Sequence, residues 1–84
     1  PNPFNPSTTL KFGLKERVIT TLEIFNILGE SVSRVVDESL DAGFYDYRLD
    51  LSGYASGMYF YKLTARNEDG AQLYGEMKKM ILLQ

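Results

Sequence analysis

The sequence predicts an all-β protein in which about seven short antiparallel strands form a two-layer sandwich. Three observations favour this fold class. Apolar residues alternate with polar ones over several short segments, which is the period of a strand with one buried face. Turn signals containing glycine separate these segments at the spacing typical of all-β folds. No segment has a convincing helical period.

Composition limits the size and the chemistry of the protein. Its 84 residues make one domain, residues 1–84, and a hydrophobic content of 44% is enough for a single thin core. The net charge of -2 and the lack of a basic run exclude a nucleic-acid footprint. The longest apolar run, residues 80–83, is far too short to span a bilayer. Because the chain opens on Pro1 rather than Met, we expect it to be one domain of a longer polypeptide.

The first nine residues contain all three prolines and are expected to form an extended lead-in. A stiff linker is the alternative, but Phe4 is a poor residue for a solvated linker, which favours an ordered segment that anchors Phe4 in the core. The first strand follows, with Leu10, Phe12 and Leu14 alternating on its buried face.

The middle of the chain predicts three more strands joined by turns. Residues 18–26 are rich in β-branched side chains, which favours a strand over a helix. A turn ending at Gly29 leads into a short strand over residues 31–36, and a polar connection closes at Gly43. A fourth strand spans residues 44–50.

Residues 56–63 are expected to form the central strand around which the others assemble. Met58 and Phe60 share one of its faces, and two tyrosines and a leucine share the other. A strand that is apolar on both sides belongs inside a sheet. We expect a core on one side and packed tyrosine rings on the other.

The last segment is predicted to return as a strand over residues 73–83. The Asp69-Gly70 pair before it is the strongest hairpin signal in the chain. The apolar residues could also be spaced for a helix, but the hairpin favours a strand. If this strand lies at a sheet edge, its free backbone groups can accept another strand; the alternative is an ordinary closing strand.

No catalytic constellation is present, so we expect a non-enzymatic protein without metal or cofactor. Histidine and cysteine are both absent, which excludes Ser-His and Cys-His nucleophile pairs, disulfides and thiolate metal sites. A run of carboxylates suggests calcium or a glycosidase pair, but the spacing does not match a calcium loop and the chain has no room for a cleft. These residues are Asp37, Glu38, Asp41, Asp46 and Asp50.

The tyrosines offer a possible platform for sugar rings, although core and cross-strand packing is the commoner role in a small sandwich. The absence of tryptophan weakens the carbohydrate interpretation further. The six residues are Tyr45, Tyr47, Tyr54, Tyr59, Tyr61 and Tyr74.

Five sequence blocks, at residues 1–9, 24–29, 42–43, 55–63 and 79–83, carry a resemblance to a known family. In their order they closely resemble the type A C-terminal sorting domain of the type IX secretion system, also called the Por secretion system. The likeness covers nearly the whole chain. The motif residues are Pro3, Phe4, Asn5, Pro6, Asn26, Gly29, Gly43, Ser56, Gly57, Tyr59 and Tyr61. The sequence departs from the family pattern at Lys15, Leu49 and Gln84.

The resemblance implies an immunoglobulin-like β-sandwich, similar also to a domain of the flagellar hook-capping protein. It implies a sorting role for secreted cargo linked upstream, passing through the periplasm to the outer-membrane surface or the medium. The implied partners are an outer-membrane translocon, its shuttle proteins and a sortase-like peptidase. The expected recognition residues are Lys79, Met80, Ile81, Leu82, Leu83 and Gln84.

Two other functions are weighed against sorting. One is an accessory immunoglobulin-like binding module, for instance for carbohydrate, within a larger secreted protein. The other is a structural spacer like the domain of the hook-capping protein.

Overall fold

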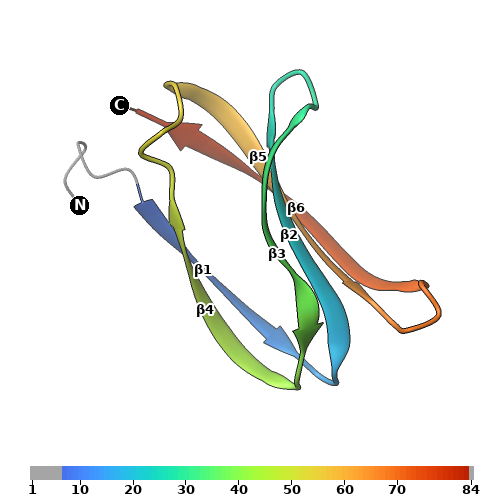
Figure 1. Cartoon of the computed structure of the whole chain (residues 1–84). Coiled ribbons are helices and arrows are strands. Elements are labelled where there is room, and N and C mark those ends of the chain that lie inside the picture. The colour runs from blue at the N-terminus through green and yellow to red at the C-terminus, as the bar shows by residue number, and fades with distance from the viewer. Residues whose placement is uncertain (1–6, 84) are drawn as a thin grey trace.

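The computed structural model describes residues 7–83, which form six β-strands and no helix (Figure 1). The all-β class is therefore confirmed, with one strand fewer than the predicted count of about seven. The strands are β1 (Ser7–Leu14), β2 (Val18–Asn26), β3 (Ser31–Leu40), β4 (Gly43–Asp50), β5 (Gly57–Arg66) and β6 (Gln72–Leu82).

The strands form two antiparallel sheets that face each other as a sandwich. The larger sheet has the order β3-β2-β5-β6, and the smaller sheet pairs β1 with β4. The hydroxyl of Tyr47 on β4 donates a hydrogen bond of 2.8 Å to the carbonyl of Val35 on β3, which joins the two layers on that side. The face of the larger sheet that packs on β1 and β4 is called the inner face below, and the opposite one the outer face.

The core lies between the layers because β2 alternates as its sequence predicts. Val18, Leu22 and Ile24 are buried on the inner face. Thr20 is also fully buried, and its hydroxyl bonds the carbonyl of Val18 at 3.4 Å. The core cluster consists of Leu22, Ile24, Val36, Leu49, Leu51, Leu63 and Leu82.

The central strand is inside the larger sheet, but its two faces have the opposite roles to those expected. Tyr59, Tyr61 and Leu63 lie on the inner face and belong to or pack against the core. Met58 and Phe60 lie on the outer face, and Met58 is 39% exposed. The expectation of tyrosine rings on the side away from the core was wrong. The smaller sheet covers only one face, so the tyrosine side is the one that becomes the core.

The third strand is longer than predicted. Residues 37–40, expected in a polar connection, continue β3 and pair with Val18 to Thr21 of β2. The prediction failed because β3 is an edge strand whose outward positions are solvated. Backbone pairing with β2 holds such a segment in the sheet without an apolar sequence.

The turn from β2 to β3 is organised by Asn26. Its side-chain oxygen accepts hydrogen bonds from the backbone N–H groups of Leu28 at 2.9 Å and Glu30 at 3.0 Å. Its backbone carbonyl accepts a bond from the N–H of Gly29, which has a φ of 80°. Asparagine and glycine are thus both needed for this turn.

The expected anchoring of Phe4 falls outside the described residues. The same holds for the other motif residues of the lead-in, Pro3, Asn5 and Pro6, and for Gln84 at the end of the chain.

Candidate functional site

The terminal strand β6 lies at the free edge of the larger sheet. From Tyr74 to Leu82 it pairs with β5 in unbroken register, and the only register shift is at its start, where Leu73 is the extra residue. Within residues 7–83, no strand lies beside the backbone groups of β6 that point away from β5. A regular edge of this kind can pair with another extended chain.

The opposite edge of the same sheet is built differently. Two register shifts interrupt the pairing of β3 with β2, and in both places the extra residue is a valine of β3, Val35 or Val32. Charged side chains, among them Arg34, Asp37 and Glu38, also line this strand. Bulges and charges are the features that protect an edge from pairing, so β3 is protected and β6 is not.

Side chains of the C-terminal segment, residues 77–83, alternate between the two faces of the sheet. Leu82 is 5% exposed in the core, and Met80 packs against the core cluster. Met77 and Ile81, which point to the outer face, are 58% and 67% exposed. Lys79 lies between them on that face and is also exposed. The strand is therefore anchored by one face and presents the other.

Three polar residues form a chain along the inner face of β6. The hydroxyl of Tyr74 donates to a carboxylate oxygen of Glu76 at 2.6 Å, and the ammonium of Lys78 lies 3.0 Å from its other oxygen. The hydrogen bond from Tyr74 and then that from Lys78 lower the pKa of Glu76. The same bonds to Glu76 raise the pKa of Tyr74 and the pKa of Lys78.

Apolar residues from neighbouring strands continue the outer face beside β6. Met58 of β5 pairs with Ile81, and Phe60 pairs with Lys79 on one side and with Phe25 of β2 on the other. These cross-strand neighbours share one face of the sheet. The outer face of the sheet at the end of β6 is therefore a surface with both apolar and cationic side chains.

The β2–β3 turn adds two exposed apolar side chains at the same end of the sheet. Ile27 and Leu28 are 67% and 79% exposed, and Figure 1 shows this turn at the end of the sheet where β6 finishes. Asn26 pairs with Tyr59, which itself pairs with Met80, so the turn is level with the last residues of β6.

The hairpin between β5 and β6 has the same turn without these apolar residues. The side-chain oxygen of Asn67 accepts bonds from the N–H groups of Asp69 and Ala71, and Gly70 has a φ of 87°. Here the two central positions are Glu68 and Asp69. This turn geometry thus accepts charged residues at its two central positions. It does not explain why the β2–β3 turn has the exposed apolar residues Ile27 and Leu28 at the same positions.

Sequence reasoning did not single out Ile27 and Leu28. The signal that could have found them is the comparison of the two Asn-x-x-Gly segments, residues 26–29 and 67–70, of which only the first is apolar in the middle.

The motif residues within the described part of the chain have mainly structural positions. Gly43 and Gly57 begin β4 and β5, and the hydroxyl of Tyr59 donates a bond of 2.7 Å to the carbonyl of Ala55. Ser56 precedes β5, and Tyr61 packs against the core. Gly57 and Tyr59 are the cross-strand partners of Leu82 and Met80, so the structure places these two motif residues beside the end of β6.

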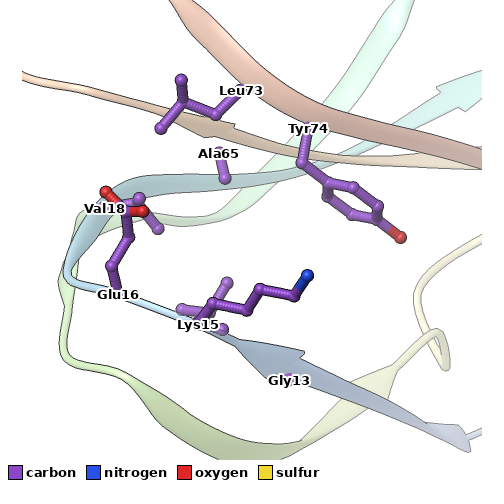
Figure 2. A pocket seen from close by; sticks show the side chains of 8 residues that line it. Gly13, Lys15, Glu16, Val18, Ala65, Leu73 and Tyr74 are labelled. Atoms are coloured by element: carbon purple, nitrogen blue, oxygen red, sulfur yellow. The ribbon is translucent and has the colours of Figure 1, made fainter.

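A cavity of about 420 Å³ opens between the β1–β2 connection and the β5–β6 hairpin. Figure 2 shows Leu73 and Tyr74 on one wall and Lys15 and Glu16 on the other. Its lining also includes Val18, which is buried in the core. It marks the open side of the sandwich, where the smaller sheet is only two strands wide.

Three of the five carboxylates considered for calcium lie beside a cationic side chain. Asp37 lies 3.5 Å from Arg34, and Asp46 lies 3.3 Å from Lys11. Asp41 pairs with the guanidinium of Arg17. Within residues 7–83, no group of three or more acidic side chains converges as a metal site.

The tyrosines considered as a sugar platform are divided among different surroundings. Four of them pack against the core cluster, and the ring of Tyr45 stacks on Phe12 with centroids 5.4 Å apart. Tyr74 is 48% exposed at the cavity. The four that pack against the core are Tyr47, Tyr54, Tyr59 and Tyr61.

Comparison with known families adds evidence that the geometry alone does not supply. Residues 1–81 match the family described as "Secretion system C-terminal sorting domain". The chain belongs to this family. The match to the sorting domain of the type IX secretion system covers nearly the whole chain, and the members of this family are signal modules. No curated protein and no solved structure matches the chain.

Membership of this family connects the sorting domain with the type IX secretion machinery and with export toward the outer membrane or the extracellular space. Among residues 7–83 there is no helix with the length and apolar character needed to cross a membrane.

Proposed function

We propose that this sorting domain directs an upstream cargo protein through the periplasm and across the bacterial outer membrane by way of the type IX translocon. The match of residues 1–81 to the sorting family carries this proposal. The geometry supports it, because the C-terminal segment lies on an unprotected edge and presents exposed side chains.

The recognition surface is the end of the larger sheet. It consists of residues 79–84, the recognition residues expected from the sequence, together with the apolar turn formed by Ile27 and Leu28. The translocon and its shuttle proteins bind this surface. A sortase-like peptidase then removes the domain and attaches the cargo to the cell surface.

A reporter fusion tests the sorting function. The chain is placed behind a periplasmically exported reporter in a host that has this secretion system, and the reporter is measured in the periplasm and in the medium. We expect the reporter at the cell surface or in the medium. Retention of the fusion in the periplasm, with the domain shown to be folded by circular dichroism, would refute the sorting proposal.

The two similar turns provide a matched test of the recognition surface. The double change Ile27→Glu and Leu28→Asp copies the residues of the second turn, so that the geometry is preserved while the apolar contact is lost. We expect export to fall and stability to stay unchanged. The reciprocal change, Glu68→Ile and Asp69→Leu, is the control and should leave export intact. Equal export by both variants would exclude the turn from the surface.

A further inference from the structure

From the unpaired edge of β6 we infer that the sorting domain binds an extended segment of its partner as an additional strand. We further infer that this segment carries an acidic residue beside Lys79 and apolar residues on either side of it. The inference rests on the proposed sorting function, since it names the chemistry of the partner at that same surface.

The backbone of β6 is regular enough for pairing over nine of its eleven residues. The register with β5 is unbroken from Tyr74 to Leu82, so the outward N–H and C=O groups alternate regularly along this stretch. Main-chain hydrogen bonds then supply affinity, and alternate side chains supply specificity.

Charge selects the position beside Lys79. Its neighbour Lys78 is already paired with Glu76 at 3.0 Å. Within residues 7–83 no ion pair involves Lys79, whose cross-strand neighbour is Phe60. Lys79 is thus the edge cation that gains a partner when a carboxylate lies opposite it.

Apolar residues select the neighbouring positions. A strand next to β6 would place its outer-face side chains beside Met77, Lys79 and Ile81, and the side chains between them beside Lys78 and Met80. Met77 and Ile81 are more than half exposed and would be covered by apolar side chains of the partner. In antiparallel order the partner therefore reads apolar, apolar, acidic, polar, apolar.

The smaller sheet has two further regular edges, β1 and β4, and both offer less for such a segment. Besides the exposed Phe44, the outward face of β4 carries Asp46, Arg48 and Asp50 rather than further apolar residues. The β1 strand also pairs without a register shift. On its outward face it carries Ser7, Thr9, Lys11 and Gly13, which provide little apolar area, and Lys11 already has Asp46 as a partner. The edge of β6 combines a regular backbone, an unpaired cation and exposed apolar side chains.

A synthetic peptide can test the pairing directly. The probe is a fluorescein-labelled peptide containing Val-Val-Asp-Thr-Val between glycine–serine flanks, titrated with the full chain and followed by fluorescence anisotropy. We expect binding, and weaker binding by about three- to tenfold when the aspartate is replaced by lysine. N-methylation at alternate peptide residues blocks the amides on one side. Two peptides are compared, one methylated at the odd-numbered residues and one at the even-numbered residues. One of them should lose binding and the other should keep it, because the amides of only one side of the peptide face β6.

Charge reversal on the domain provides the decisive variant. Lys79→Glu should invert the preference, so that the lysine peptide binds better than the aspartate peptide. A gain of binding cannot come from a misfolded variant. Lys15→Glu changes the net charge by the same amount from the β1–β2 connection and should leave the preference for aspartate unchanged.

Three results would overturn the inference. The first is no binding of either the aspartate or the lysine peptide, and the second is an equal effect of the two N-methylated peptides. The third is a Lys79→Glu variant that still prefers the aspartate peptide. The reporter fusion separates this failure from failure of the sorting proposal. Export of the reporter without peptide binding refutes strand addition alone. Retention of the reporter in the periplasm refutes the sorting function, whatever the peptide does.

Discussion

Replacing Leu82 by alanine should lower the stability of the domain, whereas replacing the adjacent Ile81 by alanine should leave stability almost unchanged and weaken peptide binding. Leu82 is 5% exposed and belongs to the core cluster, whereas Ile81 is 67% exposed on the outer face. Buried Leu→Ala changes cost about 2–5 kcal/mol. Because Leu82 is the last residue of β6, the strand end can relax around the smaller side chain. We therefore expect the free energy of unfolding to fall by about 2 kcal/mol, the lower end of this range. For Ile81→Ala we expect less than about 0.5 kcal/mol.

Thermal unfolding followed by circular dichroism measures this difference. In a domain of this size 1 kcal/mol shifts Tm by about 4–8 °C, so Leu82→Ala should lower Tm by about 8–16 °C and Ile81→Ala by less than about 4 °C. Binding of the valine–aspartate peptide should instead be weakened by Ile81→Ala. If Ile81→Ala destabilised the domain as much as Leu82→Ala, the assignment of the two faces of β6 would be wrong.

Three further predictions concern the turns, the pH dependence and the contact between layers. Gly29→Ala should lower the free energy of unfolding by about 1–2 kcal/mol, because φ is 80° at this position. An added Cβ would meet no atom within 4 Å, so a steric clash does not contribute to this loss. The control Gly53→Ala, which also lies in open space but has no positive φ, should change the urea midpoint little. Because the pKa of Glu76 is lowered in the folded state, its carboxylate stabilises the fold at pH values above its ordinary pKa of 4.5, and this stabilisation is lost as the pH falls through the lowered pKa. Glu76→Gln should therefore reduce the fall of Tm with decreasing pH in the acidic range. An unchanged fall of Tm would contradict this prediction. Tyr47→Phe removes the 2.8 Å bond to the carbonyl of Val35 and should cost about 0.5–1.5 kcal/mol in urea unfolding, while no change would show that the bond does not hold the layers together.

The alternation in the sequence was sufficient to predict most of the strands. Residues 18–26 form β2 with the predicted bounds, and the Asp69-Gly70 signal lies in the hairpin that joins β5 to β6. These features are local, because a period of two and a positive φ are properties of a few consecutive residues. The start of β1 and the last four residues of β3 were missed, since polar edge segments have no apolar signal to identify them.

The recognition residues from Lys79 to Gln84 were proposed from the apolar character of the last strand together with the family resemblance, and they stay a prediction. The structure adds a physical reason for the choice, because it places the described ones on an unprotected edge. It also adds Ile27 and Leu28, which are far from them in sequence. No local pattern connects these two segments, and only the pairing of β2, β5 and β6 brings them to the same end of the sheet.

By itself the sequence determined the fold class, the turns and the absence of histidine and cysteine chemistry, because each depends on residue type and short-range spacing. Only the tertiary structure decided which face of β5 is the core and which edge of the sheet is open. Both Met58 with Phe60 and the tyrosines with Leu63 are apolar enough to be buried. The choice between them is made by where β1 and β4 pack, and the neighbours of β6 are set by long-range pairing that no single segment encodes.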